Sequence, residues 1–213
     1  MIKAVLFDLD GTIINTNELI IKSFEHVLNE FLGLKVERNE IIKSFGEPLV
    51  KTMEYYGGTR AMEAVEEYLT FSKGIHNEYI RSYDHVEEGL KELKNNGLRL
   101  GIVTSKIREV ALKGMDIFNL APYFDVIICP EDTKKHKPDG EPVEKACREL
   151  GIKTSEALMI GDSHNDILCG KNAGAYTGVV NYTYLDRNEI MELKPDIDID
   201  RIGDIIYKIG NLT

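Results

Sequence analysis

The sequence predicts an α/β fold in which helices cover both faces of a parallel sheet and one helical subdomain interrupts the pattern. Two observations support this prediction. Short, almost continuously apolar runs alternate with amphipathic segments along most of the 213 residues, and such runs are typical of strands in a parallel sheet buried on both faces. The segment from about residue 16 to residue 83 shows only helical patterns, without a strand-like run.

The elements of the sheet domain alternate in a regular order. Each predicted strand is a short apolar run with β-branched residues. Gly97 ends the helix that precedes the second strand, and Pro142 suits the first turn of a later helix, where its missing N–H is not needed. The predicted strands span 3–7, 98–103, 126–129, 157–160, 175–180 and 197–199, and the predicted helices span 86–95, 107–118, 141–150, 165–173 and 202–209.

The helical stretch follows the first strand and is expected to form a domain of its own. Asn15 or Thr16 can cap a helix that runs to about Phe31, and Gly33 ends it. Further helical patterns continue to about Tyr83, with breaks at 46–48 and 56–58. The predicted boundaries give a core domain of residues 1–14 and 84–213 and a helical domain of residues 15–83.

The composition of the chain limits the kinds of partner that it is expected to bind. The net charge is −10, and the only dense basic run is 134–137, so no nucleic-acid footprint is evident and none is expected. The apolar runs are too short to cross a bilayer, and Asp8 and Asp10 interrupt the apolar N-terminal stretch before a signal-peptide core could form. We therefore expect no membrane association and a cytoplasmic location, with Cys129, Cys147 and Cys169 as buried reduced thiols.

Polar residues follow several of the predicted strands, at the edge of the sheet where ligands bind in open α/β folds. Carboxylates follow the first and fourth strands, hydroxyls the second, and a lysine the third. These residues are Asp8, Asp10, Thr104, Ser105, Lys137, Asp162 and Asp166.

The spacing of Asp8 and Asp10 places both carboxylates on one side of an extended segment. Two such groups repel each other unless a cation lies between them or one is protonated. Asp162 adds a third carboxylate, and an all-oxygen set of ligands suits Mg²⁺, which also binds substrate phosphates. A single Asp in a βα loop can instead serve as a helix cap; the full set of residues after several strands favours a magnesium site.

Four segments carry a resemblance to a known family. In order and spacing they resemble the four motifs of the haloacid dehalogenase superfamily, and the match spans the chain. The resemblance implies a Rossmann-like parallel-sheet core with an α-helical cap inserted between the first and second motifs. The segments are Asp8-Leu9-Asp10-Gly11-Thr12, Thr104-Ser105, Lys137-Pro138 and Gly161-Asp162-Ser163-His164-Asn165-Asp166.

The resemblance also implies a role for individual residues. Asp8 is the expected nucleophile, which forms an aspartyl-phosphate, and Asp10 is the expected general acid and base. Thr104 is expected to hydrogen-bond the transferring phosphoryl group, and Lys137 to hold Asp8 and the phosphate. Asp8, the carbonyl of Asp10, and Asp162 are expected to bind Mg²⁺ with support from Asp166, while substrate binding is assigned to Gly11, Thr12, Ser105 and Gly46.

The carboxylate of Asp10 favours phosphoryl chemistry, because the dehalogenases lack a carboxylate at that position. Two segments of the expected cap resemble particular groups of the superfamily, and the two activities remain open. The segment Ile14-Asn15-Thr16-Asn17-Glu18-Leu19-Ile20-Ile21 resembles a bacterial pyrophosphatase, and Phe45-Gly46-Glu47-Pro48-Leu49 resembles part of phosphoglycolate-phosphatase-like caps. Gly46 lies in a candidate specificity loop that could equally be a plain turn between helices. A phosphosugar mutase of the β-phosphoglucomutase type and a non-enzymatic binding module are the alternatives. The expected partner is a small phosphorylated molecule, and the protein is expected to be a monomer or homodimer.

Overall fold

The computed structural model describes residues 1–212, and the chain divides into two compact units. The first unit contains Met1–Ile14 and the chain from Ser82 onward, and the second contains Asn15–Arg81. The second boundary thus lies between Arg81 and Ser82, two residues before the position expected from the sequence.

The first unit is built on a six-stranded sheet in the order β5-β4-β1-β6-β7-β8, in which all strand pairs are parallel. This observation confirms the predicted α/β fold class. The strands are β1 (Ala4–Phe7), β4 (Arg99–Val103), β5 (Val126–Ile128), β6 (Ala157–Gly161), β7 (Tyr176–Val180) and β8 (Ile197–Ile199).

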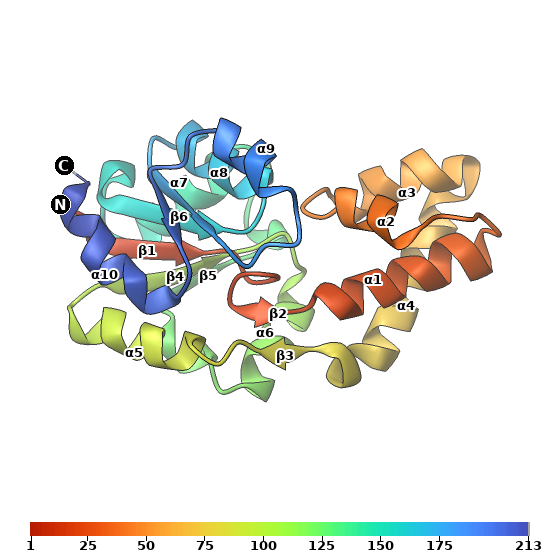
Figure 1. Ribbon diagram of the computed structural model, residues 1–213, viewed down its shortest axis with the longest axis horizontal. Coiled ribbons are helices and arrows are strands. Elements are labelled where there is room, and N and C mark those ends of the chain that lie inside the picture. Colours follow the sequence, from red (N-terminus) through yellow and green to blue (C-terminus); the bar gives the residue numbers. More distant parts are fainter. Residues whose placement is uncertain (213) are drawn as a thin grey trace. The chain divides into compact units, whose positions relative to one another are not determined.

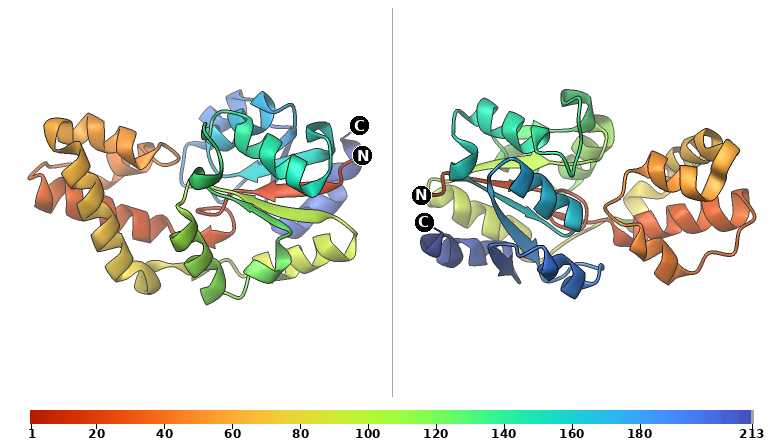
Figure 2. Two further views of the ribbon diagram at one scale, coloured as in Figure 1. Left: turned by 180° about the vertical axis from the view of Figure 1, so that it is seen from behind. Right: turned by 90° about the horizontal axis from the view of Figure 1, so that it is seen from above.

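Helices lie on both faces of this sheet (Figures 1 and 2). The helices α7 and α8 pack against one face, whereas α5 packs on the other. The helices of this unit are α5 (Val86–Asn95), α6 (Arg108–Ile117), α7 (Glu141–Leu150), α8 (His164–Asn172), α9 (Arg187–Glu192) and α10 (Ile205–Lys208).

The centre of the core lies around β1, whose four residues are all buried. Leu6 is in register with Gly101 of β4 on one side and Met159 of β6 on the other. A Cβ atom on Gly101 would lie 2.7 Å from Leu6 Cδ2 and 2.6 Å from Val126 Cγ1, so the side chains of the adjacent strands fill the space that glycine leaves. This packing fixes the position of β1 in the sheet, and therefore the position of Asp8, which directly follows it.

The second unit is helical. It contains α1 (Asn17–Glu25), a π-helical continuation at His26–Phe31, α2 (Arg38–Lys43), α3 (Leu49–Gly57) and α4 (Ala61–Tyr79). Contacts of α4 with α1 and with α3 hold the unit together, and Phe24 of α1 packs against Tyr68 with ring centroids 4.9 Å apart.

Three sequence expectations need correction. The segment up to residue 83 is not free of strands, because β3 (Arg81–Ser82) pairs with β2 (Ile14–Asn15) where the chain passes between the units. The helix α9 was not expected from the sequence; it has six residues, of which only Ile190 is buried. The helix expected over 202–209 is divided into a 3₁₀ turn, α10 and a second 3₁₀ turn.

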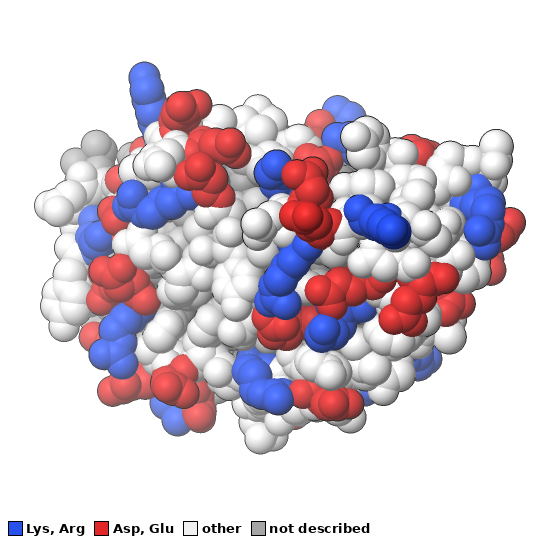
Figure 3. Space-filling model, turned by 45° about the vertical axis from the view of Figure 1, so that its right-hand side comes forward, with Lys and Arg blue, Asp and Glu red and all other residues white. Residues whose placement is uncertain are grey.

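Charged side chains are mixed on the surface. On the face shown in Figure 3, Lys and Arg lie among Asp and Glu without a broad patch of one sign. None of the helices in the described part of the chain combines the length and apolar character needed to cross a membrane.

The second unit contains a histidine whose stabilising contribution should depend on pH. His26 stacks on Phe71 with ring centroids 3.9 Å apart, and its two ring nitrogens contact Glu30 and Glu67 at 2.8 and 2.7 Å. Burial lowers the pKa of His26, but the hydrogen bonds to Glu67 and Glu30 outweigh burial, and the net pKa is raised. Protonated His26 therefore stabilises the folded state below the unfolded pKa of about 6.5, and this stabilisation is lost as the pH rises through the folded pKa.

We predict that the loss of unfolding free energy caused by His26→Gln is larger at about pH 6 than at about pH 9. Urea unfolding of both proteins at the two pH values measures the difference. A Glu30→Gln, Glu67→Gln double variant should show a smaller pH effect of the histidine substitution, because it removes the carboxylates. An equal loss at both pH values would contradict the prediction.

Candidate active site

Lys137 brings together two carboxylates from distant parts of the first unit. Its Nζ donates to Asp8 Oδ1 and to Asp166 Oδ1, each at 2.6 Å. Asp8 directly follows β1, and Asp166 lies in the first turn of α8. The second oxygen of Asp166 accepts hydrogen bonds from the Ser163 hydroxyl and backbone N–H at 2.7 and 3.1 Å. One oxygen of Asp166 therefore holds Lys137, and the other caps α8.

Asp162 completes a cluster of buried carboxylates. Oxygen atoms of Asp8, Asp162 and Asp166 lie within 4.8 Å of one another. Asp162 is 7% exposed, and its carboxylate accepts no hydrogen bond from any residue in 1–212. Gly11 lies against this carboxylate: a Cβ on Gly11, whose φ is 77°, would be 2.2 Å from Asp162 Oδ2. A residue with a side chain at Gly11 would displace Asp162.

The cluster has an excess of negative charge. Three carboxylates face one ammonium group, so two negative charges remain unbalanced. Burial raises the pKa of Asp8 to about 7, against the lowering by Lys137, and Asp166 and Asp10 add to the rise. Burial, Asp166 and Asp8 likewise raise the pKa of Asp162. For Lys137 the carboxylates outweigh burial, so its pKa is raised and the amine stays protonated.

These residues fit a hard divalent cation. The donors are all oxygen atoms, as Mg²⁺ prefers, and Asp162 offers a buried carboxylate without a hydrogen-bond donor. A charge of +2 would balance the excess in the cluster and reduce the repulsion that adds to the effect of burial on the pKa of Asp8 and Asp162. The cluster could therefore bind a metal ion.

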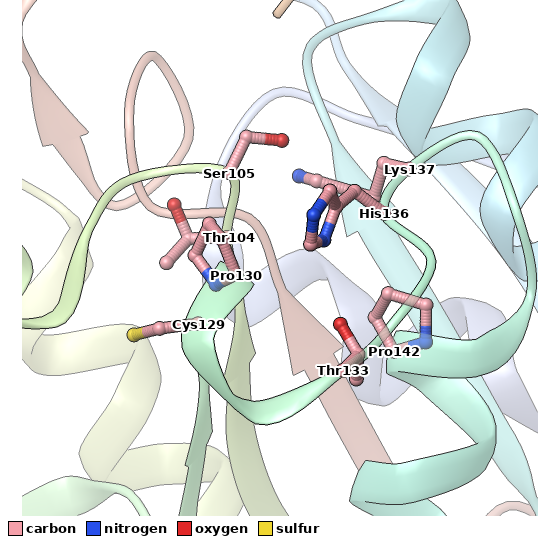
Figure 4. A pocket seen from close by; sticks show the side chains of 8 residues that line it. All are labelled: Thr104, Ser105, Cys129, Pro130, Thr133, His136, Lys137 and Pro142. Carbon is pink, nitrogen blue, oxygen red and sulfur yellow. The ribbon is translucent and has the colours of Figure 1, made fainter.

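Thr104 and Ser105 follow β4 and line a small pocket together with Lys137 (Figure 4). Thr104 is 6% exposed, and its hydroxyl accepts a hydrogen bond from the Lys106 N–H at 3.1 Å. In Figure 4 the Lys137 amine extends toward the loop that carries Thr104 and Ser105. The structure thus brings the hydroxyls after β4 and the lysine after β5 to one edge of the sheet, where Asp8 also lies.

Asp10 has a partner that the sequence analysis missed. Its Oδ1 accepts from Lys106 Nζ at 2.7 Å, and the two side chains are 24% and 14% exposed. The carboxylate of Asp10 is not one of the three in the buried cluster. Lys106 directly follows the Thr104-Ser105 pair, and this position in the sequence could have indicated that it belongs to the site. A lysine in a loop is ordinarily solvent-exposed, so it was not selected.

The remaining predicted residues are distributed between the units. Gly11 and Thr12 lie in the loop after β1; Thr12 is fully buried, and its hydroxyl has no hydrogen-bond partner among residues 1–212. Gly46 lies in the second unit between α2 and α3 and has a φ of 81°. The assignment of these residues and of Ser105 to substrate binding stays a prediction.

Curated relatives match the chain over almost its whole length. It is 45% identical to a protein of Clostridium perfringens that carries the name pyrophosphatase PpaX provisionally, over 99% of this chain and 100% of the relative. It is 41% identical to the pyrophosphatase PpaX of Halalkalibacterium halodurans, over 98% of this chain and 97% of the relative.

Solved structures share the fold. A crystal structure from Lactobacillus plantarum, provisionally described as a phosphoglycolate phosphatase, superimposes with a TM-score of 0.88 at 26% identity, over 97% of this chain and 99% of the other. The family model of haloacid dehalogenase-like hydrolases matches residues 5–180. With this match and the full-length relatives, the resemblance of the four motifs is confirmed, and the chain belongs to the haloacid dehalogenase-like hydrolases.

Proposed function

We propose that the protein is a Mg²⁺-dependent phosphatase that hydrolyses a small phosphorylated substrate through a covalent phosphoryl group on Asp8. The observation that carries the proposal is the hydrogen bonding of the Asp8 carboxylate. Lys137 holds one of its oxygens at 2.6 Å, while the other accepts no hydrogen bond within residues 1–212. A carboxylate with one oxygen fixed and the other unoccupied is arranged to attack phosphorus.

The proposed reaction has two steps. In the first, an Asp8 oxygen forms a bond to phosphorus, the bond from phosphorus to the leaving oxygen breaks, and Asp10 donates a proton to that oxygen. In the second, Asp10 takes a proton from water, the water oxygen attacks phosphorus, and the bond to Asp8 breaks. Phosphate leaves, and both carboxyl groups return to their starting state.

The neighbouring residues supply charge and position. Lys137 offsets negative charge on Asp8 and on the phosphoryl oxygens, and the Thr104 hydroxyl is available to donate to one of those oxygens. Lys106 Nζ lies 2.7 Å from Asp10 Oδ1 and fixes the position of that carboxyl group. Asp8, the carbonyl of Asp10, and Asp162 would hold Mg²⁺ with support from Asp166, and the ion would add positive charge at the transferring group.

Inorganic pyrophosphate is the substrate we favour. The relatives at 45% and 41% identity carry the name pyrophosphatase, the first of them provisionally, whereas the structure provisionally described as a phosphoglycolate phosphatase is 26% identical. Phosphoglycolate is the second candidate. Three buried free cysteines suit a reducing compartment, and we place the enzyme in the cytoplasm.

The substitution Asp8→Asn tests the covalent step. Asparagine preserves the shape of the side chain but is not an effective nucleophile, so phosphate release should fall by about a thousandfold or more. The measurement is phosphate release from pyrophosphate and p-nitrophenyl phosphate, with circular dichroism to verify folding. Asp116→Asn, at an exposed position on α6, is the matched control and should retain full activity. Wild-type turnover by Asp8→Asn would exclude the mechanism.

The choice of substrate is tested with a panel of phosphate compounds at equal concentration. We expect pyrophosphate to give the highest kcat/KM, phosphoglycolate a lower value, and hexose phosphates the lowest. The panel is scored by free phosphate, and sugar phosphates are also examined for isomerisation. A higher kcat/KM for phosphoglycolate would reverse our preference, and isomerisation without phosphate release would indicate a mutase.

The metal is tested by stability as well as by activity. EDTA should abolish turnover and Mg²⁺ should restore it. In a thermal melt, Mg²⁺ should raise Tm of the wild type, because it binds the folded state and relieves the repulsion between carboxylates. Asp162→Asn should reduce that rise, since it removes a proposed ligand. Full activity in EDTA, or an equal rise in Tm for both proteins, would contradict the assignment.

A further inference from the structure

Two of the five residues after β7 contact two loops of the active site. The Tyr182 hydroxyl donates to the Thr12 carbonyl at 2.9 Å, and the adjacent Thr183 hydroxyl donates to the Asp162 carbonyl at 2.7 Å. The first loop carries Asp10, and the second carries Asp162. We call residues 181–185 the brace. Neither Tyr182 nor Thr183 belongs to the motifs described above.

The loop after β1 depends on side chains for part of its hydrogen bonding. Backbone bonds from Gly11 N to Ile14 O and from Ile14 N to Leu9 O, at 2.8 and 2.9 Å, close its turn. The carbonyl groups of Gly11 and Thr12 take part in neither of these bonds. Among residues 1–212, the hydrogen bonds to these two carbonyls come from tyrosine hydroxyls: Tyr83 donates to Gly11 at 3.2 Å, and Tyr182 donates to Thr12.

The two tyrosines hold each other in place. Their ring centroids are 4.6 Å apart, and the His85 ring lies 5.2 Å from that of Tyr182. Burial, with smaller contributions from Tyr83 and Asp162, raises the pKa of Tyr182, so its hydroxyl remains protonated and keeps its proton for the Thr12 carbonyl. An aromatic ring fixed by neighbours places its hydroxyl with little loss of conformational freedom.

The two loops also touch each other within the site. The Gly11 backbone lies so close to Asp162 that a Cβ would meet its carboxylate. A shift of either loop would therefore move the other. The brace bonds to both loops through adjacent residues, so the loops cannot move apart without breaking one of these hydrogen bonds. The close approach of Gly11 to Asp162 prevents the loops from moving nearer to each other.

We propose that Tyr182 and Thr183 are positioning residues, which hold the loops of Asp10 and Asp162 at the separation that phosphoryl transfer requires. The inference rests on the proposed function, because it assigns Asp10 the role of acid and base. Tyr182 acts on proton transfer through the Asp10 loop, and Thr183 acts on the metal-binding carboxylate through the backbone of Asp162. A displacement of a catalytic group by a fraction of an ångström lowers the rate without weakening substrate binding.

The test uses substitutions that remove one hydroxyl each. Tyr182→Phe and Thr183→Val should each lower kcat for pyrophosphate about threefold to tenfold, the effect of losing one or two neutral hydrogen bonds, and leave KM within about twofold. Thr183→Val also removes the hydrogen bond that the Thr183 hydroxyl accepts from the Leu185 N–H at 3.1 Å. Thr183→Ser keeps a hydroxyl and should restore most of the rate. Tyr207→Phe, at a tyrosine that is 77% exposed and has no hydroxyl contact within residues 1–212, should match the wild type. A wild-type kcat in both hydroxyl variants would overturn the proposal.

A double-variant cycle separates positioning from general stabilisation. In an Asp10→Asn background, Tyr182→Phe should lower the remaining rate by less than twofold, because the carboxylate that the loop positions is absent. Thr183→Val should reduce the Mg²⁺-induced rise in Tm, because the Thr183 hydroxyl holds the backbone of the proposed ligand Asp162. An equal fall in kcat in both backgrounds would mean that Tyr182 only stabilises the fold.

Failure of the brace inference can be distinguished from failure of the proposed function. If Asp8→Asn is inactive while the brace variants turn over at the wild-type rate, the covalent mechanism stands and the brace inference fails. If Asp8→Asn is active, the proposed function fails on that result alone.

Discussion

The ion contacts of Lys137 are the interaction on which the rest of the site depends. An ammonium group that is 6% exposed would be strongly destabilised without partners, and Asp8 and Asp166 compensate for its burial at 2.6 Å each. These partners are 129 and 29 residues away in the sequence. The contact therefore ties the loop after β5 to the end of β1 and to the start of α8. Loss of the lysine would leave Asp8 and Asp166 close together in a buried space without their shared cation, which is more costly than loss of the whole set.

The charge around Lys137 also bears on how an acidic chain could act on an anion. The protein carries a net charge of −10, and its surface charges are mixed on the face shown in Figure 3, so attraction of an anion has to be local. Lys137 contacts the proposed nucleophile Asp8, and Lys106 contacts the proposed proton donor Asp10. Both are engaged with carboxylates, and the buried cluster keeps a negative excess. In the proposed function a divalent ion corrects that excess, so binding of metal and substrate should reinforce each other.

The sequence was sufficient for the framework of the fold, because alternation of apolar strands with helices is encoded locally. Runs such as 157–160 are buried on both faces and contain no polar residue, and Asp8, Thr104, Lys137 and Asp162 follow their strands directly or after one loop. The two-residue strands β2 and β3 have no periodicity to detect, and α9 buries a single side chain. The contacts of Lys106 with Asp10 and of Tyr182 with Thr12 span 96 and 170 residues. Both contacts depend on how loops that follow different strands are placed in space, and no local sequence pattern specifies that placement.

The residues of the buried cluster cannot account for a preference between the two candidate substrates. Pyrophosphate and phosphoglycolate present the same terminal phosphoryl group to Asp8 and differ only beyond the bridging oxygen. The cluster of Asp8, Lys137, Asp162 and Asp166 would treat that group alike in both substrates, and the brace would fix its loops equally for both. Preference must therefore come from groups that meet the leaving portion, which is a second phosphate in one case and a carboxylate on a carbon in the other. A leaving phosphate carries more charge than a leaving glycolate, so cations beyond Lys137 should favour pyrophosphate through electrostatic attraction.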